Sequence, residues 1–499
     1  MDQMASPPLV LDVDLGRRRD GDPPLAARIA RAISDDIRRG RLRPGAELPS
    51  SRALATTLGV HRNTALAAYA ELEAEGWIET QPRRGTFVSA AMPERPARRF
   101  APAVTAPPDA PGFALAPAPS ATLGLPPPSA IGPDALPLLG GRPDLRLAPT
   151  VALARAYRRA LRGARGRTLL DYGDPTGNPR LRAALVDLLA ATRGIVPRTE
   201  RLMVTRGSQM ALVLAARTLL SPGDVVAVEA FGYRPAWAAL ELAGARLAPV
   251  PVDDDGLDVA ALERLAAREP RLRAVYVTPH HQYPTTATLT APRRVALLAL
   301  ARARRLAIIE DDYDHEFHYD GRPILPLAAA DEGGNVVSIG TLSKVLAPGV
   351  RLGWLVGPAV VVERAAALRR VLDRQGDLAV EEAMAALVED GELERHIRRT
   401  RRIYEARRAT FLALLARHLD GTLTYRAPAG GMALWARAGE RVDVDAWAAR
   451  AAARGVLLQT ARQFRFDGAP APAMRLGFAS LDERELTEAV RRLAATFRR

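Results

Sequence analysis

Residues 338–354, SIGTLSKVLAPGVRLGW, follow an apolar run that predicts a buried strand, and they contain Lys344. Lys344 is the only lysine among the 70 Lys and Arg residues of the chain. An arginine guanidinium stays protonated, whereas a lysine amine can lose its proton in a desolvated site and condense with an aldehyde to form a Schiff base. The count alone fits such a chemical role and a lysine left by chance on the surface equally well.

The residues around Lys344 are donors that suit a phosphate group. Thr341 and Ser343 offer hydroxyls, and the Arg351 guanidinium can bind a phosphate through two hydrogen bonds. The cation of Arg351 should also lower the pKa of a desolvated lysine. A second phosphate-binding element is predicted in residues 201–220, where a strand, a turn and the first backbone N–H groups of a helix follow one another. The first residues of this helix are Gly207, Ser208 and Gln209.

An apolar strand runs directly into a cluster of acids in residues 305–317, RLAIIEDDYDHEF. In α/β sheets the carboxyl ends of strands face the ligand crevice. A carboxylate there could pair with a protonated pyridine nitrogen, and Tyr313 could donate to a phenolate oxygen. Alternatively, the acids and His315 could bind a divalent metal. We expect no metal site, because no phosphate-transfer or hydrolase motif accompanies the acids.

Two further residues complete the pattern of a ligand site. Tyr233 follows a buried strand in residues 225–237, VVAVEAFGYRPAW, where an aromatic ring could stack on a flat ligand or simply pack. Arg475, in residues 474–481, MRLGFASL, is a candidate for binding a substrate carboxylate. Together, the lysine, acid, hydroxyl, phosphate donors, aromatic ring and arginine indicate a pyridoxal 5′-phosphate site.

In this order, the segments from about residue 140 to 499 resemble the fold-type I aminotransferases, which have a large α/β domain and a smaller C-terminal α+β subdomain. The resemblance implies that Lys344 carries the aldimine, that Asp311 pairs with the ring nitrogen and that Tyr313 contacts the ring hydroxyl. It also implies that Tyr233 stacks on the ring and that Arg475 binds a carboxylate. The residues near the cofactor phosphate would be Gly207, Ser208, Gln209, Ser343 and Arg351. Thr286 stands where these proteins have a glycine, on the substrate side.

The first part of the chain has the pattern of a small helical unit with a hairpin. Leu25, Ile29, Ile33 and Ile37 recur every four residues and predict a helix that ends at Gly40. After a loop, Ser50 or Ser51 can cap a short helix, and a glycine turn leads to a helix over about 62–75. We expect Leu66, Tyr69 and Leu72 to face inward on this helix. The two short strands WIET and GTFV follow, joined by the basic turn QPRRG.

This order predicts a winged helix-turn-helix, whose second helix enters the major groove of DNA. The predicted base contacts lie at the start of that helix, at His61, Arg62, Asn63 and Thr64. Arg52, Arg83 and Arg84 are placed for phosphate or minor-groove contact. A module that binds protein instead is the alternative. Residues 48–88, LPSSRALATTLGVHRNTALAAYAELEAEGWIETQPRRGTFV, resemble the DNA-binding domain of the GntR-type bacterial repressors.

The composition bounds the organisation of the chain. We expect a DNA-binding domain over 21–90, a Pro/Ala-rich linker over 91–135 and an α/β domain over 136–499. The net charge of +14 suits a polyanion such as DNA, although an arginine-rich genome would raise it too. No secretory signal and no membrane span are predicted, and the absence of cysteine rules out disulfides and is compatible with the cytoplasm.

A winged helix joined to an aminotransferase-like domain resembles the MocR-type subfamily of GntR regulators. The resemblance implies a homodimer that binds operator DNA and senses pyridoxal phosphate or an amino compound through the aldimine. One alternative is a functional aminotransferase that carries a DNA-binding appendage. Another is a DNA-binding protein with a vestigial cofactor domain.

Overall fold

The structure is a computed structural model, and it describes residues 23–93, 113–115, 132, 134–321 and 324–497. The chain divides into two compact units, unit 1 (Met1–Ala114) and unit 2 (Leu115–Arg499). Most of the predicted linker, residues 94–112, 116–131 and 133, lies outside the described residues. Within the described ranges, no helix has both the length and the apolar character needed to cross a membrane.

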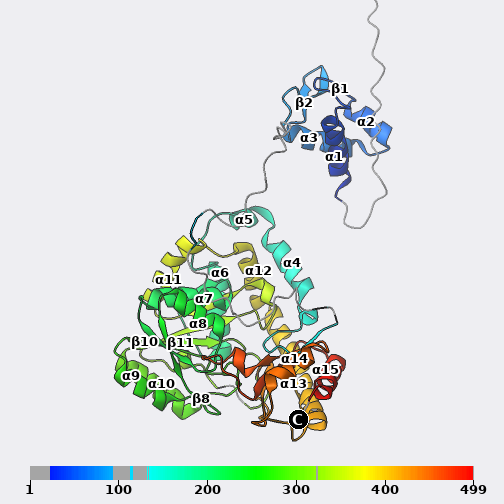
Figure 1. Cartoon of the computed structure of the whole chain (residues 1–499). Helices are drawn as coiled ribbons and strands as arrows, with labels where there is room; N and C mark the ends of the chain where they lie inside the picture. Colours follow the sequence, from blue (N-terminus) through cyan, green and yellow to red (C-terminus); the bar gives the residue numbers. More distant parts are fainter. Residues whose placement is uncertain (1–22, 94–112, 116–131, 133, 322–323, 498–499) are drawn as a thin grey trace, which may run out of the picture. The chain divides into compact units, whose positions relative to one another are not determined.

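Unit 1 is a winged helix-turn-helix, as the sequence predicts (Figure 1). Its three strands form an antiparallel sheet in the order β1-β3-β2. Strand β1 lies in the stretch that we expected to be a loop, where Glu47 and Leu48 pair with Phe87 and Thr86. The elements are α1 (Leu25–Arg38), β1 (Glu47–Leu48), α2 (Ser51–Leu58), α3 (Arg62–Ala74), β2 (Ile78–Gln81) and β3 (Gly85–Val88).

The core of unit 1 follows the predicted stripe of α1 closely but not that of α3. Ile29, Ile33 and Ile37 are buried as expected. The expectation that Leu66 faces inward is wrong, since its side chain is 44% exposed. Ala65, Ala68, Tyr69 and Leu72 are buried instead, at the spacing i, i+3, i+4 and i+7 of one helix face. Leu66 lies about 100° around the helix from Ala65 and therefore off that face.

Unit 2 contains a seven-stranded sheet in the order β5-β13-β12-β11-β10-β6-β7. Neighbouring strands are parallel except for β13, which is antiparallel to both β12 and β5. The strands are β5 (Leu202–Thr205), β6 (Val225–Glu229), β7 (Arg246–Val250), β10 (Leu272–Val277), β11 (Ala307–Asp312), β12 (Val336–Thr341) and β13 (Gly353–Val356). A small hairpin joins β8 (Val252–Asp253) to β9 (Gly256–Leu257).

Helices cover both faces of this sheet, because successive strand residues point to opposite sides. In β6, Val226 and Val228 pack in the cluster formed with α7 and α8, whereas Val225 and Ala227 pack in the cluster formed with α9 and α10. The helices of this part are α4 (Thr150–Ala160), α5 (Gly163–Thr168), α6 (Pro179–Arg193), α7 (Gly207–Leu219), α8 (Arg234–Leu242), α9 (Val259–Arg268), α10 (Ala291–Arg304), α11 (Ala359–Leu372) and α12 (Leu378–Glu389). Short 3-10 turns lie at Leu145–Leu147, Thr199–Arg201, Leu327–Ala329, Pro348–Val350 and Ala461–Gln463.

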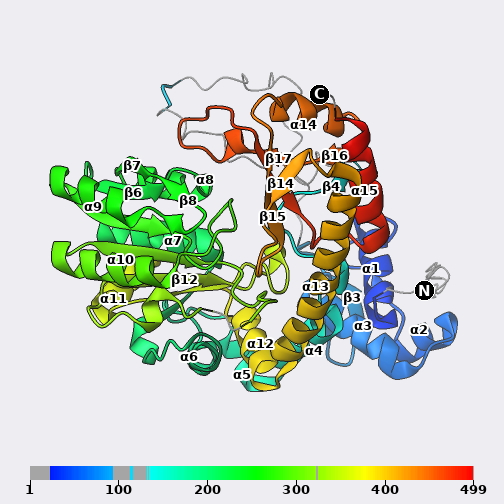
Figure 2. The same ribbon diagram turned by 90° about the horizontal axis from the view of Figure 1, so that it is seen from below.

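The C-terminal part of unit 2 is a smaller α+β subdomain, so the predicted fold class is confirmed. Its four-stranded sheet has the order β14-β15-β18-β17 and is antiparallel. The long helix α13 (Glu392–Leu419) lies beside α15 (Glu483–Ala495) on this sheet (Figure 2). The remaining elements are β14 (Leu423–Tyr425), β15 (Ala433–Ala438), α14 (Val444–Ala452), β17 (Gln459–Thr460), β18 (Ala473–Gly477) and the parallel pair β4 (Leu136–Pro137) and β16 (Val456–Leu457).

Candidate functional site

The predicted cofactor residues meet in one pocket of about 210 Å³ at the carboxyl edge of the seven-stranded sheet. They arrive there because β5, β6, β11 and β12 are all parallel, so the segments that follow these strands lie at the same edge. Eight predicted residues line the pocket: Ser208, Gln209, Tyr233, Asp311, Tyr313, Ser343, Lys344 and Arg351. Gly207 and Arg475 do not line it but contact residues that do.

The amine of Lys344 lies in this pocket and donates a hydrogen bond to the carbonyl oxygen of Gly141 at 2.7 Å. Burial, and to a smaller extent the cation of Arg475, lower the pKa of Lys344 to about 8, although the carboxylates of Asp314 and Asp311 oppose the shift. The lowered pKa was expected, but Arg351 is not among its main causes. The guanidinium of Arg351 instead donates to the carbonyl oxygen of Arg206 at 2.8 Å.

The acids at the end of β11 have different partners, and alternation along the strand places Asp311 on the opposite face from Glu310 and Asp312. The carboxylate of Glu310 accepts hydrogen bonds from the backbone N–H groups of Leu327 and Ala328. Asp312 forms a buried ion pair with Arg193 at 2.5 Å. Only Asp311, between them, lines the cofactor pocket. Just beyond the strand, Asp314 pairs with His281.

Asp311 is held by a residue that the sequence did not point to. The hydroxyl of Tyr276, in β10, donates to Asp311 Oδ2 at 2.9 Å, and both side chains are buried. Burial raises the pKa of Asp311 to about 7, and the Tyr276 hydrogen bond opposes this shift. The other oxygen, Oδ1, is buried and has no hydrogen-bond partner among the described residues. A cationic N–H of a ligand ring would satisfy it.

The other end of the pocket is built to approach an anion closely. Gly207 begins α7 with φ of 74°, and a Cβ added there would lie 2.9 Å from the guanidinium nitrogens of Arg351. The glycine therefore provides both the left-handed backbone and the room for the arginine. The Thr341 hydroxyl donates to Ser343 Oγ at 3.0 Å. Two hydroxyls, a guanidinium and a helix N-terminus thus converge where a phosphate can bind.

Aromatic side chains form the walls of the pocket. The Tyr233 and Tyr283 rings meet edge to face, with their centroids 5.4 Å apart. The Tyr313 hydroxyl donates to the carbonyl oxygen of His281 at 2.9 Å. Arg475 is buried, its guanidinium lies over the Tyr283 ring, and it donates to the carbonyl oxygen of Pro284 at 2.6 Å. Its Nε has no partner among the described residues, so it retains a donor.

The residues present fit pyridoxal 5′-phosphate. Lys344 offers an amine to the aldehyde, the unpaired Oδ1 of Asp311 suits a protonated ring nitrogen, and the donors of Ser343, Arg351 and the start of α7 suit the phosphate. When bound, the cofactor supplies an aldehyde that reacts with amines and a ring that accepts electrons.

Several lining residues were missed by the sequence reasoning. Tyr276 lies in the run LRAVYV. Its hydroxyl is the only polar side-chain group at the end of this otherwise apolar strand, and it is the only feature that could have pointed to the site. Gly141 follows another glycine, and such a pair is a sign of close backbone approach. The remaining lining residues that we did not assign to the site are Thr278, Tyr283 and Pro348.

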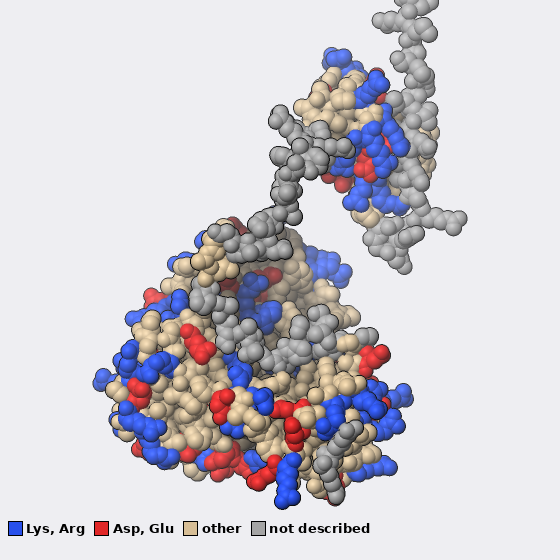
Figure 3. All heavy atoms as spheres, viewed as in Figure 1, with Lys and Arg blue, Asp and Glu red and all other residues tan. Residues whose placement is uncertain are grey.

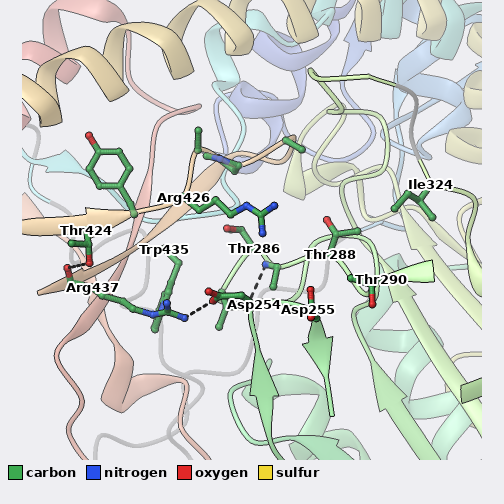
Figure 4. A pocket seen from close by; sticks show the side chains of 16 residues that line it. Asp254, Asp255, Thr286, Thr288, Thr290, Ile324, Thr424, Arg426, Trp435 and Arg437 are labelled. Carbon is green, nitrogen blue, oxygen red and sulfur yellow. Dashed lines mark hydrogen bonds and ion pairs between the residues drawn. The ribbon is translucent and has the colours of Figure 1, made fainter. Parts of the chain in front are cut away.

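A second cavity of about 520 Å³ lies between the loop 285–290 and strands β14 and β15 (Figure 4). Arg437 and Asp254 form an ion pair at 2.7 Å at this cavity. Thr286 lines the cavity with φ of 62°, a left-handed conformation that a β-branched residue rarely adopts. Thr286 thus has the backbone conformation that suits the glycine of the related proteins, and its side chain adds a hydroxyl and a methyl group to the wall.

The predicted DNA contacts lie on one end of α3 and on the hairpin of unit 1. Arg52, His61, Arg62 and Asn63 are exposed and Thr64 is half-buried. The ring of His61 also caps α3, because its Nδ1 accepts from the Asn63 backbone N–H at 3.2 Å. Arg83 and Arg84 are exposed in the turn between β2 and β3. The three acids Glu71, Glu73 and Glu75 lie at the opposite end of α3 or just beyond it.

Residues 23–93 carry ten arginines and seven acids, a net charge of +3. On the face seen in Figure 3, basic side chains cover much of unit 1 and acidic ones are fewer. Because the acids at the end of α3 lie away from its start, the start of the helix can approach a phosphate backbone without direct repulsion from them.

Both parts of the chain match known protein families. Residues 25–88 match the family of bacterial regulatory proteins of the gntR type. Residues 144–493 match aminotransferase class I and II.

Relatives and solved structures agree with this division. The chain is 34% identical to the Probable rhizopine catabolism regulatory protein MocR of Rhizobium meliloti, over 98% of this chain and 96% of that protein. It is 35% identical to the HTH-type transcriptional regulator TauR of Rhodobacter capsulatus, over 96% of this chain and 97% of that protein.

Among solved structures, the α-aminoadipate aminotransferase LysN of Thermus thermophilus, complexed with N-(5′-phosphopyridoxyl)-L-leucine, is 28% identical, with a TM-score of 0.69 over 75% of this chain and 95% of that one. The family and the geometry of the pocket together identify pyridoxal 5′-phosphate as the cofactor of this chain. The chain therefore belongs to the MocR-type subfamily of GntR transcriptional regulators, in which a winged helix-turn-helix is joined to an aminotransferase class I and II domain.

Proposed function

We propose that unit 2 is the sensor of this regulator, that its signal is an amino compound or pyridoxal phosphate itself, and that Lys344 is the residue that makes the covalent contact. The observation that carries the proposal is the Lys344 amine in the cofactor pocket with its pKa lowered to about 8, on the same chain as a DNA-binding unit. At about pH 7 such an amine is neutral in about one molecule in ten, against about one in 2500 for an ordinary lysine. A neutral amine is the form that attacks an aldehyde.

Each neighbouring residue has a defined task in this proposal. Asp311 holds a proton at the ring nitrogen, and Tyr276 orients that carboxylate. The guanidinium of Arg351 and the hydroxyl of Ser343 bind the phosphate. Arg475 offers its unpaired Nε to a carboxylate of the effector.

The signal must reach the DNA through a change in conformation. An effector shifts an equilibrium only by its different affinities for two states, so the states of unit 2 must differ in how they let unit 1 bind. We propose a homodimer, in which two winged helices bind paired half-sites of an operator. The segment over 91–135 would join the two domains, 21–90 and 136–499.

The experiment compares the wild type with Lys344→Ala and Lys344→Arg, the second of which keeps the positive charge. In the wild type, pyridoxal phosphate should give a visible absorbance band, and amino compounds that change this band should change operator affinity in a mobility-shift assay. Both variants should lose the band and the response. An effector response that survives in Lys344→Arg would refute the covalent role.

The DNA contacts are tested separately. Arg62→Ala should lower operator affinity by about 1–3 kcal/mol, the cost of a base contact, and leave the cofactor absorbance unchanged. Arg31→Ala, at an exposed arginine of α1, is the matched control and should bind as the wild type does. Equal losses in both variants would show a general charge effect and not a contact at the start of α3.

A working aminotransferase with a DNA-binding appendage is the second candidate. It is favoured by the complete cofactor set and by the buried Arg475 with a free donor beside the pocket. Sustained exchange between an amino acid and a keto acid, at the rates of ordinary enzymes, would support it. A single half-reaction, or none, would support the sensor.

A further inference from the structure

Four of the seven histidines of the chain lie together next to the cofactor pocket. The ring of His280 is at the centre, with centroid distances of 4.4 Å to His281, 4.5 Å to His315 and 5.9 Å to His318. This histidine cluster adjoins the cofactor pocket through Tyr313, whose hydroxyl donates to the backbone carbonyl oxygen of His281. None of these imidazoles has a task in the cofactor chemistry described above.

Two rings of this cluster, those of His280 and His318, have no hydrogen-bond partner among the described residues. The side chain of His280 is 3% exposed, and neither of its ring nitrogens has a hydrogen-bond partner among the described residues. The same is true of both ring nitrogens of His318, which is only partly buried. A buried polar group without a partner destabilises the fold, so these unsatisfied ring nitrogens call for an explanation.

One ring of the cluster is already oriented as metal-binding histidines are. His281 Nδ1 is 2.7 Å from Asp314 Oδ1, and a carboxylate in this position fixes the ring and turns the other nitrogen outward. Gly430 lets the backbone approach that side closely, because a Cβ added there would lie 2.6 Å from His281 Nε2. A larger residue at position 430 would therefore block the second ring nitrogen of His281.

We propose that His280, His281 and His318 bind one Zn²⁺ ion through three neutral imidazoles, with a fourth position open to water or a small ligand. One nitrogen from each ring lies within 4.8 Å of the other two. Two nitrogens on one tetrahedral zinc ion, each with a bond of about 2.1 Å, are about 3.4 Å apart, so the rings would have to rotate toward one another to close the site. The proposal departs from the sequence-based expectation of no metal, which considered the acids and His315.

A second set, formed by His280, Asp312 and His315, also has suitable spacing but is less suitable in charge. Asp312 already forms a buried ion pair with Arg193 at 2.5 Å and lies 3.1 Å from His315 Nδ1. A metal ion there would have to approach the buried cation of Arg193. Among the described residues, no cation forms a hydrogen bond or ion pair with the set of three histidines, and the partial exposure of His318 gives a path of entry.

The test uses the full chain loaded with pyridoxal phosphate, without a polyhistidine tag and after treatment with a chelator. Calorimetric titration with ZnCl₂ should show one ion bound per chain. His318→Ala should weaken binding at least about 100-fold, more than the about 10- to 100-fold loss caused by removing an outer partner of a metal ligand. His418→Ala, at an exposed histidine of α13, should bind as the wild type does, and so should His315→Ala.

The cofactor absorbance of each variant reports that the fold is intact, because His318 lies outside the cofactor pocket. His318→Gln is a second variant that preserves size and polarity, and it should show the same loss. The proposal is overturned if the wild type takes up no zinc. It is also overturned if binding is lost in His315→Ala but retained in both His318 variants, since that result assigns the ion to the other set.

Discussion

Replacing Tyr276 by phenylalanine removes a single oxygen atom and leaves the buried ring in place. That oxygen donates to Asp311 Oδ2 at 2.9 Å, and Asp311 has no other hydrogen-bond partner among the described residues. If Asp311 is the partner of the ring nitrogen, its carboxylate must be charged and correctly turned when the cofactor binds. The Tyr276 hydroxyl serves both needs, because it favours the charged form and fixes the orientation.

The size of the effect follows from this one bond. A hydrogen bond to a charged group contributes about 1.5–3 kcal/mol, which corresponds to a loss of about 10- to 150-fold in cofactor affinity. The same energy corresponds to a rise of about one to two units in the pKa of Asp311. The loss of affinity should therefore grow as the pH falls, since a protonated Asp311 cannot pair with a cationic ring.

The assay is a titration of cofactor-free protein with pyridoxal phosphate, followed by visible absorbance at several pH values. Tyr157→Phe removes a hydroxyl from an exposed tyrosine of α4 and is the matched control. Equal affinities of Tyr276→Phe and the wild type, with the same dependence on pH, would refute the assignment of Asp311 as the ring-nitrogen partner.

Three further predictions address the phosphate end, the pH dependence and unit 1. Gly207→Ala should weaken cofactor binding, because an alanine in the left-handed backbone conformation costs about 1–2 kcal/mol and its Cβ would lie 2.9 Å from the Arg351 guanidinium. Unchanged binding in an absorbance titration would contradict this prediction. Burial raises the pKa of Asp311 to about 7, so the folded state holds the carboxyl proton of Asp311 more tightly than the unfolded chain does. The protonated carboxyl therefore stabilises the folded state below about pH 4, and this stabilisation is lost as the pH rises towards about 7. Asp311→Asn should therefore reduce the fall in the Tm of cofactor-free protein over this range, whereas the exposed Asp187→Asn should not. Ser50→Ala should destabilise unit 1 by about 1 kcal/mol in chemical denaturation, because Ser50 caps α2, while its neighbour Ser51→Ala should have a smaller effect.

The positions of the strand ends could be predicted from the sequence, and they brought most of the site together. An apolar run followed by polar residues marks the carboxyl end of a buried strand, as in the segments that lead to Tyr233, Asp311 and Lys344. Parallel strands bring such ends to one edge. Tyr276 could not be found in this way, because it lies inside an apolar run and only the register of β10 beside β11 brings its hydroxyl to Asp311.

The sequence pattern indicated that the neighbouring acids of residues 305–317 form one cluster, but they do not act together. Glu310, Asp311 and Asp312 are adjacent in the chain, yet each has a different partner, and alternation along β11 places Asp311 on the opposite face from the other two. The error at Leu66 has a similar origin, since alanines at 65 and 68 give a weak apolar signal but fit close to the other helices. The short strand β1 was hidden because two residues are too few to show a period.

The buried arginines explain why one lysine is enough. Arg193, Arg369 and Arg475 are almost fully buried. Arg193 and Arg369 each direct several donors to carboxylates or carbonyl oxygens, which a planar guanidinium does well, and Arg475 donates to the carbonyl oxygen of Pro284. Such a group keeps its charge and cannot give up a proton. The Lys344 amine makes only one hydrogen bond to a described residue, and burial has already lowered its pKa. Arginine can therefore fill the structural positions of this chain, and the chemistry of the pocket requires the one basic side chain that can become neutral.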